Sequence, residues 1–124
     1  MGIIKQNDLV FIKTANTGTG KVEVHVASGT SGYQTRILET GTTFLPETDG
    51  TWLLTDFEGT GKQDDLVFIK TANTGTGKVE VHVASGSSGY QTRILETGTT
   101  FLPETDGTWL LTSSIKIRVL EFQP

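Results

Sequence analysis

The sequence contains the same segment twice. Asp8–Thr55 and Asp65–Thr112 align without a gap at a spacing of 57 residues, and they differ only where Thr30 is replaced by Ser87. Such near-identity is typical of repeat architectures, in which each unit buries its apolar face against a neighbouring unit. The chain therefore divides into a first repeat at 1–57, a second repeat at 58–112 and a C-terminal segment at 113–124, and we expect two units to be too few to stand alone.

Each repeat has the pattern of four short antiparallel β-strands. Four runs rich in β-branched and aromatic residues predict the strands, and the connectors "ANTGTGK", "GTSG" and "LPETDG" carry the residues that turns demand. In the first repeat the predicted strands are Leu9–Thr14, Val22–Ser28, Gln34–Thr43 and Thr51–Phe57. The 15 glycines also favour a turn-rich all-β protein over a helical one.

Four-stranded units at this period predict the blades of a β-propeller. If Thr51–Phe57 is the innermost strand of a blade, the chain begins at a second strand and ends after a lone innermost strand that starts near Trp109. One blade is then split across the termini, so we expect homo-oligomerisation to complete the ring. Two blade-equivalents per chain permit a dimer, a trimer or a tetramer; the six-bladed trimer is favoured, and an extra strand is predicted within 113–124.

Composition excludes several classes of function. The net charge is −4 and the ten basic residues are scattered, so no nucleic-acid partner is predicted. No apolar run approaches the roughly 20 residues of a membrane-spanning helix, and no signal peptide is expected at the start of this sequence. Cysteine is absent, each repeat has one histidine, and the G-x-S-x-G and H-E-x-x-H motifs are missing, so the chain is not predicted to be an enzyme.

The candidate ligand-binding residues gather around the histidine of each repeat. In "VEVHVAS" the alternation places Val22, Val24 and Val26 on one face of a strand and His25 on the other. A Gly/Ser turn and a Tyr-Gln pair follow, and a saccharide pocket needs such an aromatic platform and hydrogen-bonding groups. A cross-strand pair that satisfies its own hydrogen bonds is the alternative for His25 and Tyr33. The candidates are His25, Ser28, Tyr33, Gln34 and Trp52, with their counterparts His82, Ser85, Tyr90, Gln91 and Trp109; for the two tryptophans, packing between blades is the favoured alternative.

Two segments resemble a known family. "TWLLTDFEGTGKQDDLVFIKT" resembles the FG-GAP type of propeller repeat, and "LVFIKTANTGTGKVEVHVASGSSGYQTR" is similar to the blades of fungal propeller lectins of the Psathyrella velutina type. The resemblance implies a secreted or extracellular carbohydrate-binding protein that recognises N-acetylglucosamine and, as in some members, sialic acid. The family has seven blades in one chain, which two repeats cannot reproduce, so a designed two-repeat fragment of such a lectin would account for this sequence.

FG-GAP repeats often carry a calcium loop, and the resemblance places it at "DFEGTGKQDD". Asp56, Glu58 and Asp64 would supply carboxylate oxygens, the ligands that calcium prefers. Thr60 stands where the family motif has a carboxylate or an amide, and the spacing to the last aspartate is altered, so a plain acidic turn is the alternative. No cofactor is required by this sequence, and calcium is a candidate ligand.

Two functions are consistent with the sequence. In the first, the ring is a multivalent lectin with repeated sites for N-acetylglucosamine-type glycans, in which avidity strengthens each individual contact. In the second, the chain is a symmetric, self-assembling propeller scaffold that has not kept sugar binding.

Overall fold

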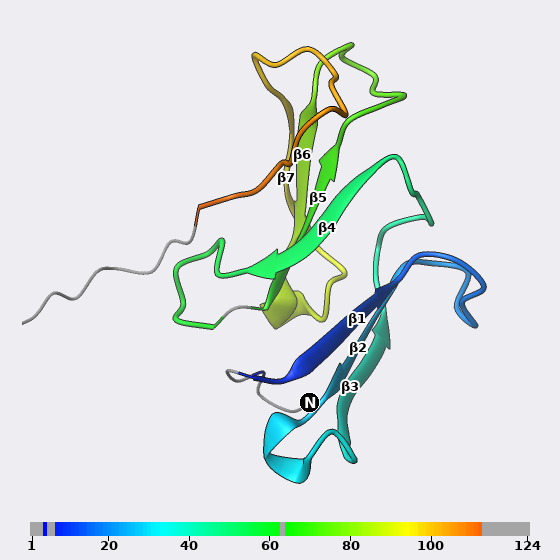
Figure 1. Ribbon diagram of the computed structural model, residues 1–124, viewed down its shortest axis with the longest axis vertical. Helices are drawn as coiled ribbons and strands as arrows, with labels where there is room; N and C mark the ends of the chain where they lie inside the picture. Colours follow the sequence, from blue (N-terminus) through cyan, green and yellow to red (C-terminus); the bar gives the residue numbers. More distant parts are fainter. Residues whose placement is uncertain (1–3, 5–6, 63, 113–124) are drawn as a thin grey trace, which may run out of the picture.

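The structure is a computed structural model that describes residue 4, residues 7–62 and residues 64–112; the strand predicted within 113–124 lies outside the described residues. The fold is all-β, as predicted, and consists of two antiparallel sheets (Figure 1). No helix in the described part of the chain is long and apolar enough to cross a membrane. The three-stranded sheet has the order β1 (Leu9–Lys13), β2 (Glu23–Ala27), β3 (Arg36–Gly41), and the four-stranded sheet has the order β4 (Gly50–Thr55), β5 (Asp65–Lys70), β6 (Glu80–Ala84), β7 (Arg93–Gly98).

Both sheets are meanders in which each strand pairs with the next one along the chain. Corresponding strands keep the same register, with Phe11 opposite His25 in the first repeat and Phe68 opposite His82 in the second. Short 3-10 turns at Gly29–Ser31 and Gly86–Ser88 follow β2 and β6. The predicted alternation is confirmed, because Val22, Val24 and Val26 are all fully buried.

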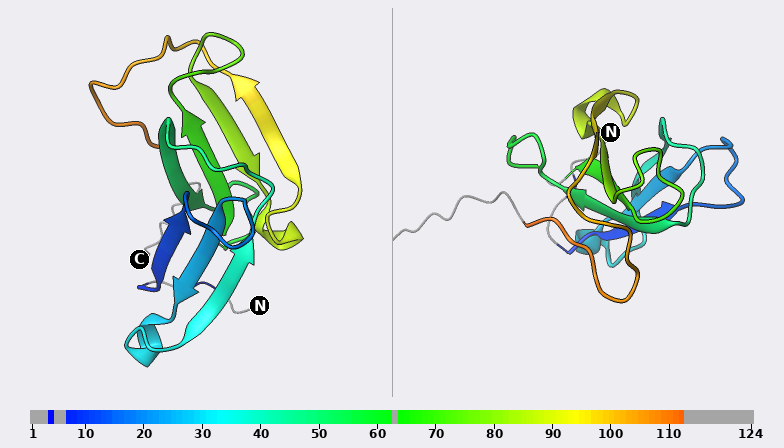
Figure 2. Two further views of the ribbon diagram at one scale, coloured as in Figure 1. Left: turned by 90° about the vertical axis from the view of Figure 1, so that its right-hand side faces the viewer. Right: turned by 90° about the horizontal axis from the view of Figure 1, so that it is seen from above.

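The main core lies between the two sheets, which pack against each other (Figure 2). The three-stranded sheet contributes the valine face of β2 together with Leu38. The four-stranded sheet contributes the opposite kind of face, which carries Leu66, Phe68 and Ala84. The valine face of the first repeat therefore packs on the histidine face of the second repeat, which carries Phe68 opposite His82.

The innermost strand predicted near Trp109 does not form in this chain. Residues 108–112 have the same sequence as residues 51–55, yet only the first of these segments is a strand. β4 forms because β5 lies beside it from Gly50↔Lys70 to Thr55↔Asp65. No described strand lies beside residues 108–112, and β1, which the repeat pattern would place there, is the free edge strand of the other sheet.

Candidate functional site

Each histidine is held between two glutamates of its own sheet. His25 Nε2 lies 2.9 Å from Glu23 Oε1, and His25 Nδ1 lies 3.3 Å from Glu39 Oε2. Glu23 is two residues away on the same face of β2, and Glu39 is directly opposite on β3. His82 makes the same contacts with Glu80 and Glu96 at 2.9 and 3.2 Å. Both hydrogen bonds of His82 therefore go to carboxylates, while His25 bonds to Glu23 through Nε2 and lies 3.4 Å from the Arg36 guanidinium at Nδ1. Neither histidine pairs with the predicted tyrosine partner.

These contacts change the titration of the glutamate beside the histidine. The hydrogen bond from His25 and the hydrogen bonds from Thr19 lower the pKa of Glu23 to about 2. Burial raises the pKa of Glu80, but the hydrogen bonds from His82 and Thr76 outweigh it and the pKa is lowered overall. Each histidine thus stabilises an ionised carboxylate at the centre of its sheet.

The serines behind the histidines build the turn. The Ser31 hydroxyl donates to the carbonyl of Ser28 and accepts hydrogen bonds from the backbone N–H groups of Gln34 and Thr35. Ser28 pairs with the hydroxyl of Thr30, at 2.9 Å. In the second repeat the buried Ser85 makes the same contact with the hydroxyl of Ser87, at 2.9 Å, and its hydroxyl also donates to Glu58 Oε1. These groups stabilise the local fold, and Ser85 has little room for a ligand.

The two tyrosines have opposite environments. Tyr33 is 51% exposed, whereas Tyr90 is 0% exposed and belongs to the core between the sheets. Burial raises the pKa of Tyr90 well above its ordinary value. Both tyrosines have a positive φ, 68° and 67°, which fixes the direction of the side chain alike in the two repeats. Tyr33 is open because neither described sheet packs on it, whereas the buried Tyr90 ring offers no face to a sugar.

Of the remaining candidates, Trp52 and Gln91 lie at the boundary between the sheets. Trp52 stacks on Phe68 with ring centroids 4.1 Å apart and meets Phe44 edge-on at 5.1 Å, so it is a packing residue. The Gln91 side chain donates to the carbonyl of Gly41 on the other sheet at 3.2 Å, while Gln34 donates only to its own loop, at Gly32.

The acidic loop after β4 is built as a hydrogen-bonded turn. The Asp56 carboxylate accepts the backbone N–H groups of Thr60 and Gly61 at 2.8 and 2.7 Å. Burial raises its pKa, but these hydrogen bonds outweigh the burial and lower the pKa overall. Glu58 is engaged by Ser85, and the described residues contain no group of three or more His, Cys, Asp or Glu placed to hold a metal. The Asp56 carboxylate oxygens already accept hydrogen bonds from N–H groups, so they are poorly placed to bind calcium as well. In this conformation the loop fits the plain acidic turn better than a calcium loop.

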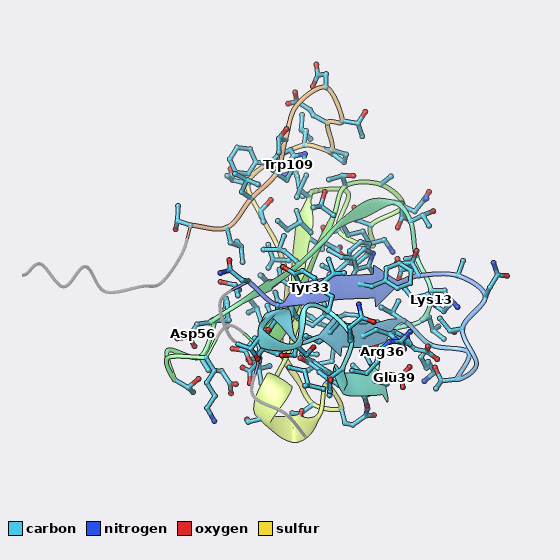
Figure 3. The ribbon with its side chains drawn as sticks, turned by 60° about the horizontal axis from the view of Figure 1, so that its bottom comes forward. Lys13, Tyr33, Arg36, Glu39, Asp56 and Trp109 are labelled. Atoms are coloured by element: carbon cyan, nitrogen blue, oxygen red, sulfur yellow. The ribbon has the colours of Figure 1, made fainter. Side chains whose placement is uncertain are left out.

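The sequence did not indicate the most unusual surface, the histidine face of the three-stranded sheet. A groove there is lined by Leu9, Phe11, Lys13, His25, Val26, Ala27 and Arg36, and Figure 3 shows Arg36 next to Glu39. Leu9 and Phe11 are 58% and 57% exposed, but their counterparts Leu66 and Phe68 are 0% and 1% exposed. Identical residues are therefore core in one repeat and surface in the other.

A second groove lies at the opposite end of the repeat array, around Trp109. Its lining is Phe101, Glu104, Asp106, Gly107, Thr108 and Trp109. Phe101 meets Trp109 edge-on at 5.2 Å, and the indole N–H donates to the carbonyl of Glu104 at 2.9 Å, as Trp52 does to Glu47. The loop keeps the conformation of the first repeat, but its carboxylates face solvent.

Three comparisons give this chain no relatives: no model of a protein family, no curated protein and no solved structure matches it.

Proposed function

We propose that the chain is a self-assembling protomer that associates head to tail with identical copies to close a β-propeller ring. One observation carries the proposal: the face that includes Leu9 and Phe11 is exposed in the first repeat and is core in the second. The valine face that covers it within the chain is present again at the other end, in the cluster of Val67, Ile69, Val79 and Val83. There no further sheet of the described chain covers it, and its packing partners are Leu53, Val81, Leu95, Trp109 and Leu111. Two different complementary faces make a heterologous contact, which propagates from copy to copy until it closes.

Strand addition would join the same two ends. The outer edge of β1 pairs with no other strand of the described chain, and such edges are templates for pairing with another chain. Residues 107–112 repeat the sequence of β4, which pairs with β5. A shift by the repeat spacing places Trp109 of one copy opposite Phe11 of the next, as Trp52 lies opposite Phe68 within the chain. Each sheet of the ring then has four strands, and three chains give the favoured six blades.

The mass of the particle in solution tests this proposal. Three chains of 13.4 kDa give about 40 kDa, and a dimer or a tetramer would give about 27 or 54 kDa. We expect light scattering to give the mass of one of these closed rings, with the trimer favoured. The mass should not increase further at higher protein concentration. A particle with the mass of a single chain at millimolar protein would overturn the proposal.

Glycan binding of the N-acetylglucosamine type is a second candidate. The observation that favours it is the groove at Trp109, where two aromatic rings lie beside the carboxylates of Glu104 and Asp106. An aromatic platform with nearby acceptors suits the apolar face and the hydroxyl groups of a pyranose. The exposed Tyr33 and Gln34 offer a further polar and aromatic surface.

Calorimetric titration with N-acetylglucosamine tests this candidate, with glucose as the control that lacks the acetamido group. We expect saturable heat with N-acetylglucosamine at millimolar concentration and a smaller response with glucose. If neither sugar gives heat at that concentration, the chain is a scaffold and not a lectin.

A further inference from the structure

The contact between the two repeats includes a polar cluster beside the apolar core. Lys70 Nζ lies 2.8 Å from Glu47 Oε1, and the Asn73 side chain donates to Asp49 Oδ2 at 3.1 Å. The backbone N–H of Thr71 donates to the carbonyl of Asp49 at 2.9 Å. These contacts join the loop before β4 to the end of β5 and the turn that follows it. We call them the polar clamp.

The polar clamp is partly buried. The Lys70 and Glu47 side chains are 18% and 30% exposed, and the hydrogen bond from Lys70 to Glu47 raises the pKa of the ammonium group. An ion pair in such a position is less screened than one on an open surface. It can therefore help to fix how β4 aligns on β5.

Both halves of a second polar clamp are present in the chain, at opposite ends. The counterparts of Glu47 and Asp49 in the second repeat are Glu104 and Asp106, and both are exposed. The counterparts of Lys70 and Asn73 in the first repeat are Lys13 and Asn16. Over residues 7–62 and 64–112, the side chains of Lys13, Glu104 and Asp106 make no ion pair or hydrogen bond. Each half has the charge that the other requires.

We propose that Lys13 and Asn16 of one copy bind Glu104 and Asp106 of the next copy and thereby set the register in which residues 107–112 add to β1. The inference rests on the proposed assembly, and it names the specific contacts of that assembly. A one-residue slip in register would turn Trp109 away from Phe11, so a polar contact that fixes the register protects the whole apolar junction. Charged contacts at interfaces serve this purpose more than they supply affinity.

The same contact would close the groove at Trp109. Lys13 and Asn16 would occupy the side of the groove where the carboxylates of Glu104 and Asp106 now face solvent. A sugar bound in that groove and the next copy would then exclude each other.

Charge reversal tests the polar clamp. Lys13→Glu and Glu104→Lys each place like charges at the junction, so we expect each to raise the dissociation constant for assembly by about tenfold or more. The double variant restores an opposite pair and should recover the wild-type mass. In an equimolar mixture of the two single variants, every junction between unlike variants restores an opposite pair, so association should be stronger than for either variant alone. A ring with an even number of chains can alternate completely, whereas a trimer keeps one junction between like variants and should recover only in part. Sedimentation velocity over a range of concentrations measures all of these.

Two controls separate the outcomes. Lys62→Glu makes the same change of charge in the exposed loop after β4 and should leave the mass unchanged. The neutral variants Lys13→Met and Glu104→Gln remove the attraction without repulsion and should weaken assembly less. If the wild-type protein forms rings and the variants Lys13→Glu and Glu104→Lys form them equally well, the second polar clamp proposed between copies does not exist. The proposed assembly would still stand in that case. If the wild-type protein is a single chain, the proposed function fails as well.

Discussion

At the scale of the residue, the histidines are structural partners of carboxylates. The pattern E-x-H in β2 places Glu23 and His25 on one face, and the pairing of β2 with β3 adds Glu39. The sequence showed that the first two share a face. It did not show the third contact, because that depends on the register between two strands and on the bulge at Val26/Ala27.

The Glu23 carboxylate should make the stability depend on acid. Its pKa is lowered from 4.5 to about 2 in the folded chain, first by the hydrogen bond with His25. A depressed pKa contributes stability that is fully present above pH 4.5 and is lost as the pH falls towards 2, because the unfolded chain takes up the proton first. We therefore expect Glu23→Gln to lower the urea midpoint clearly at pH 6 and much less at pH 3. An equal loss at both pH values would contradict the role of the ionised carboxylate.

At the scale of the element, identical sequences take different structures because a strand needs a neighbour. Thr51–Thr55 lies beside β5 and is part of β4, while residues 108–112 pair with no strand of the described chain and remain irregular. The backbone of Gly50 lies so close to β5 that an added Cβ would sit 2.1 Å from the carbonyl oxygen of Ile69. Around Gly107, an added Cβ meets nothing within 4 Å.

This difference predicts unlike effects of one substitution. Gly50→Ala should destabilise the chain itself by about 1–3 kcal/mol, because the backbone of β5 must shift. Gly107→Ala should leave the secondary structure unchanged by circular dichroism and weaken assembly, since its Cβ would meet Ile12 of the next copy. Gly18→Ala, also in open space, is the control. If Gly107→Ala assembles like the wild type, residues 107–112 do not add to β1 in the register of β4.

The sequence was sufficient to predict the strands whose pairing partners lie next to them along the chain. Alternation and turn residues predicted the strands to within two residues of their observed ends; β2, for example, was expected at Val22–Ser28 and forms at Glu23–Ala27. It was not sufficient where burial depends on another repeat. Tyr33 and Tyr90 lie in identical segments, and only the sheet that packs on the second one makes it a core residue. The exposed Leu9 and Phe11 were missed for the same reason.

At the scale of the whole molecule, the chain contains one complete contact between two sheets, and the proposed assembly would repeat that contact between copies. One end of the chain carries the exposed Leu9 and Phe11 beside the edge strand β1. The valine cluster at the other end is buried within its own sheet, and the carboxylates of Glu104 and Asp106 near it are exposed. A single chain thus leaves Leu9, Phe11 and Leu110 in water, each more than half exposed. Burial of these side chains between copies would add hydrophobic stabilisation to that of the two clusters within the chain.

Folding should therefore be coupled to association. A partner that binds only the folded state stabilises it by mass action, so the midpoint of thermal unfolding should rise with the concentration of the chain, by about 3 °C for each tenfold increase. Differential scanning calorimetry from micromolar to millimolar protein measures this rise, and Lys13→Glu should shift the whole curve to lower temperature. Lys62→Glu should follow the wild-type curve. A midpoint that stays constant over this range, in a sample whose mass is that of a ring, would show that each chain folds without its neighbours and that the junction contributes little to its stability.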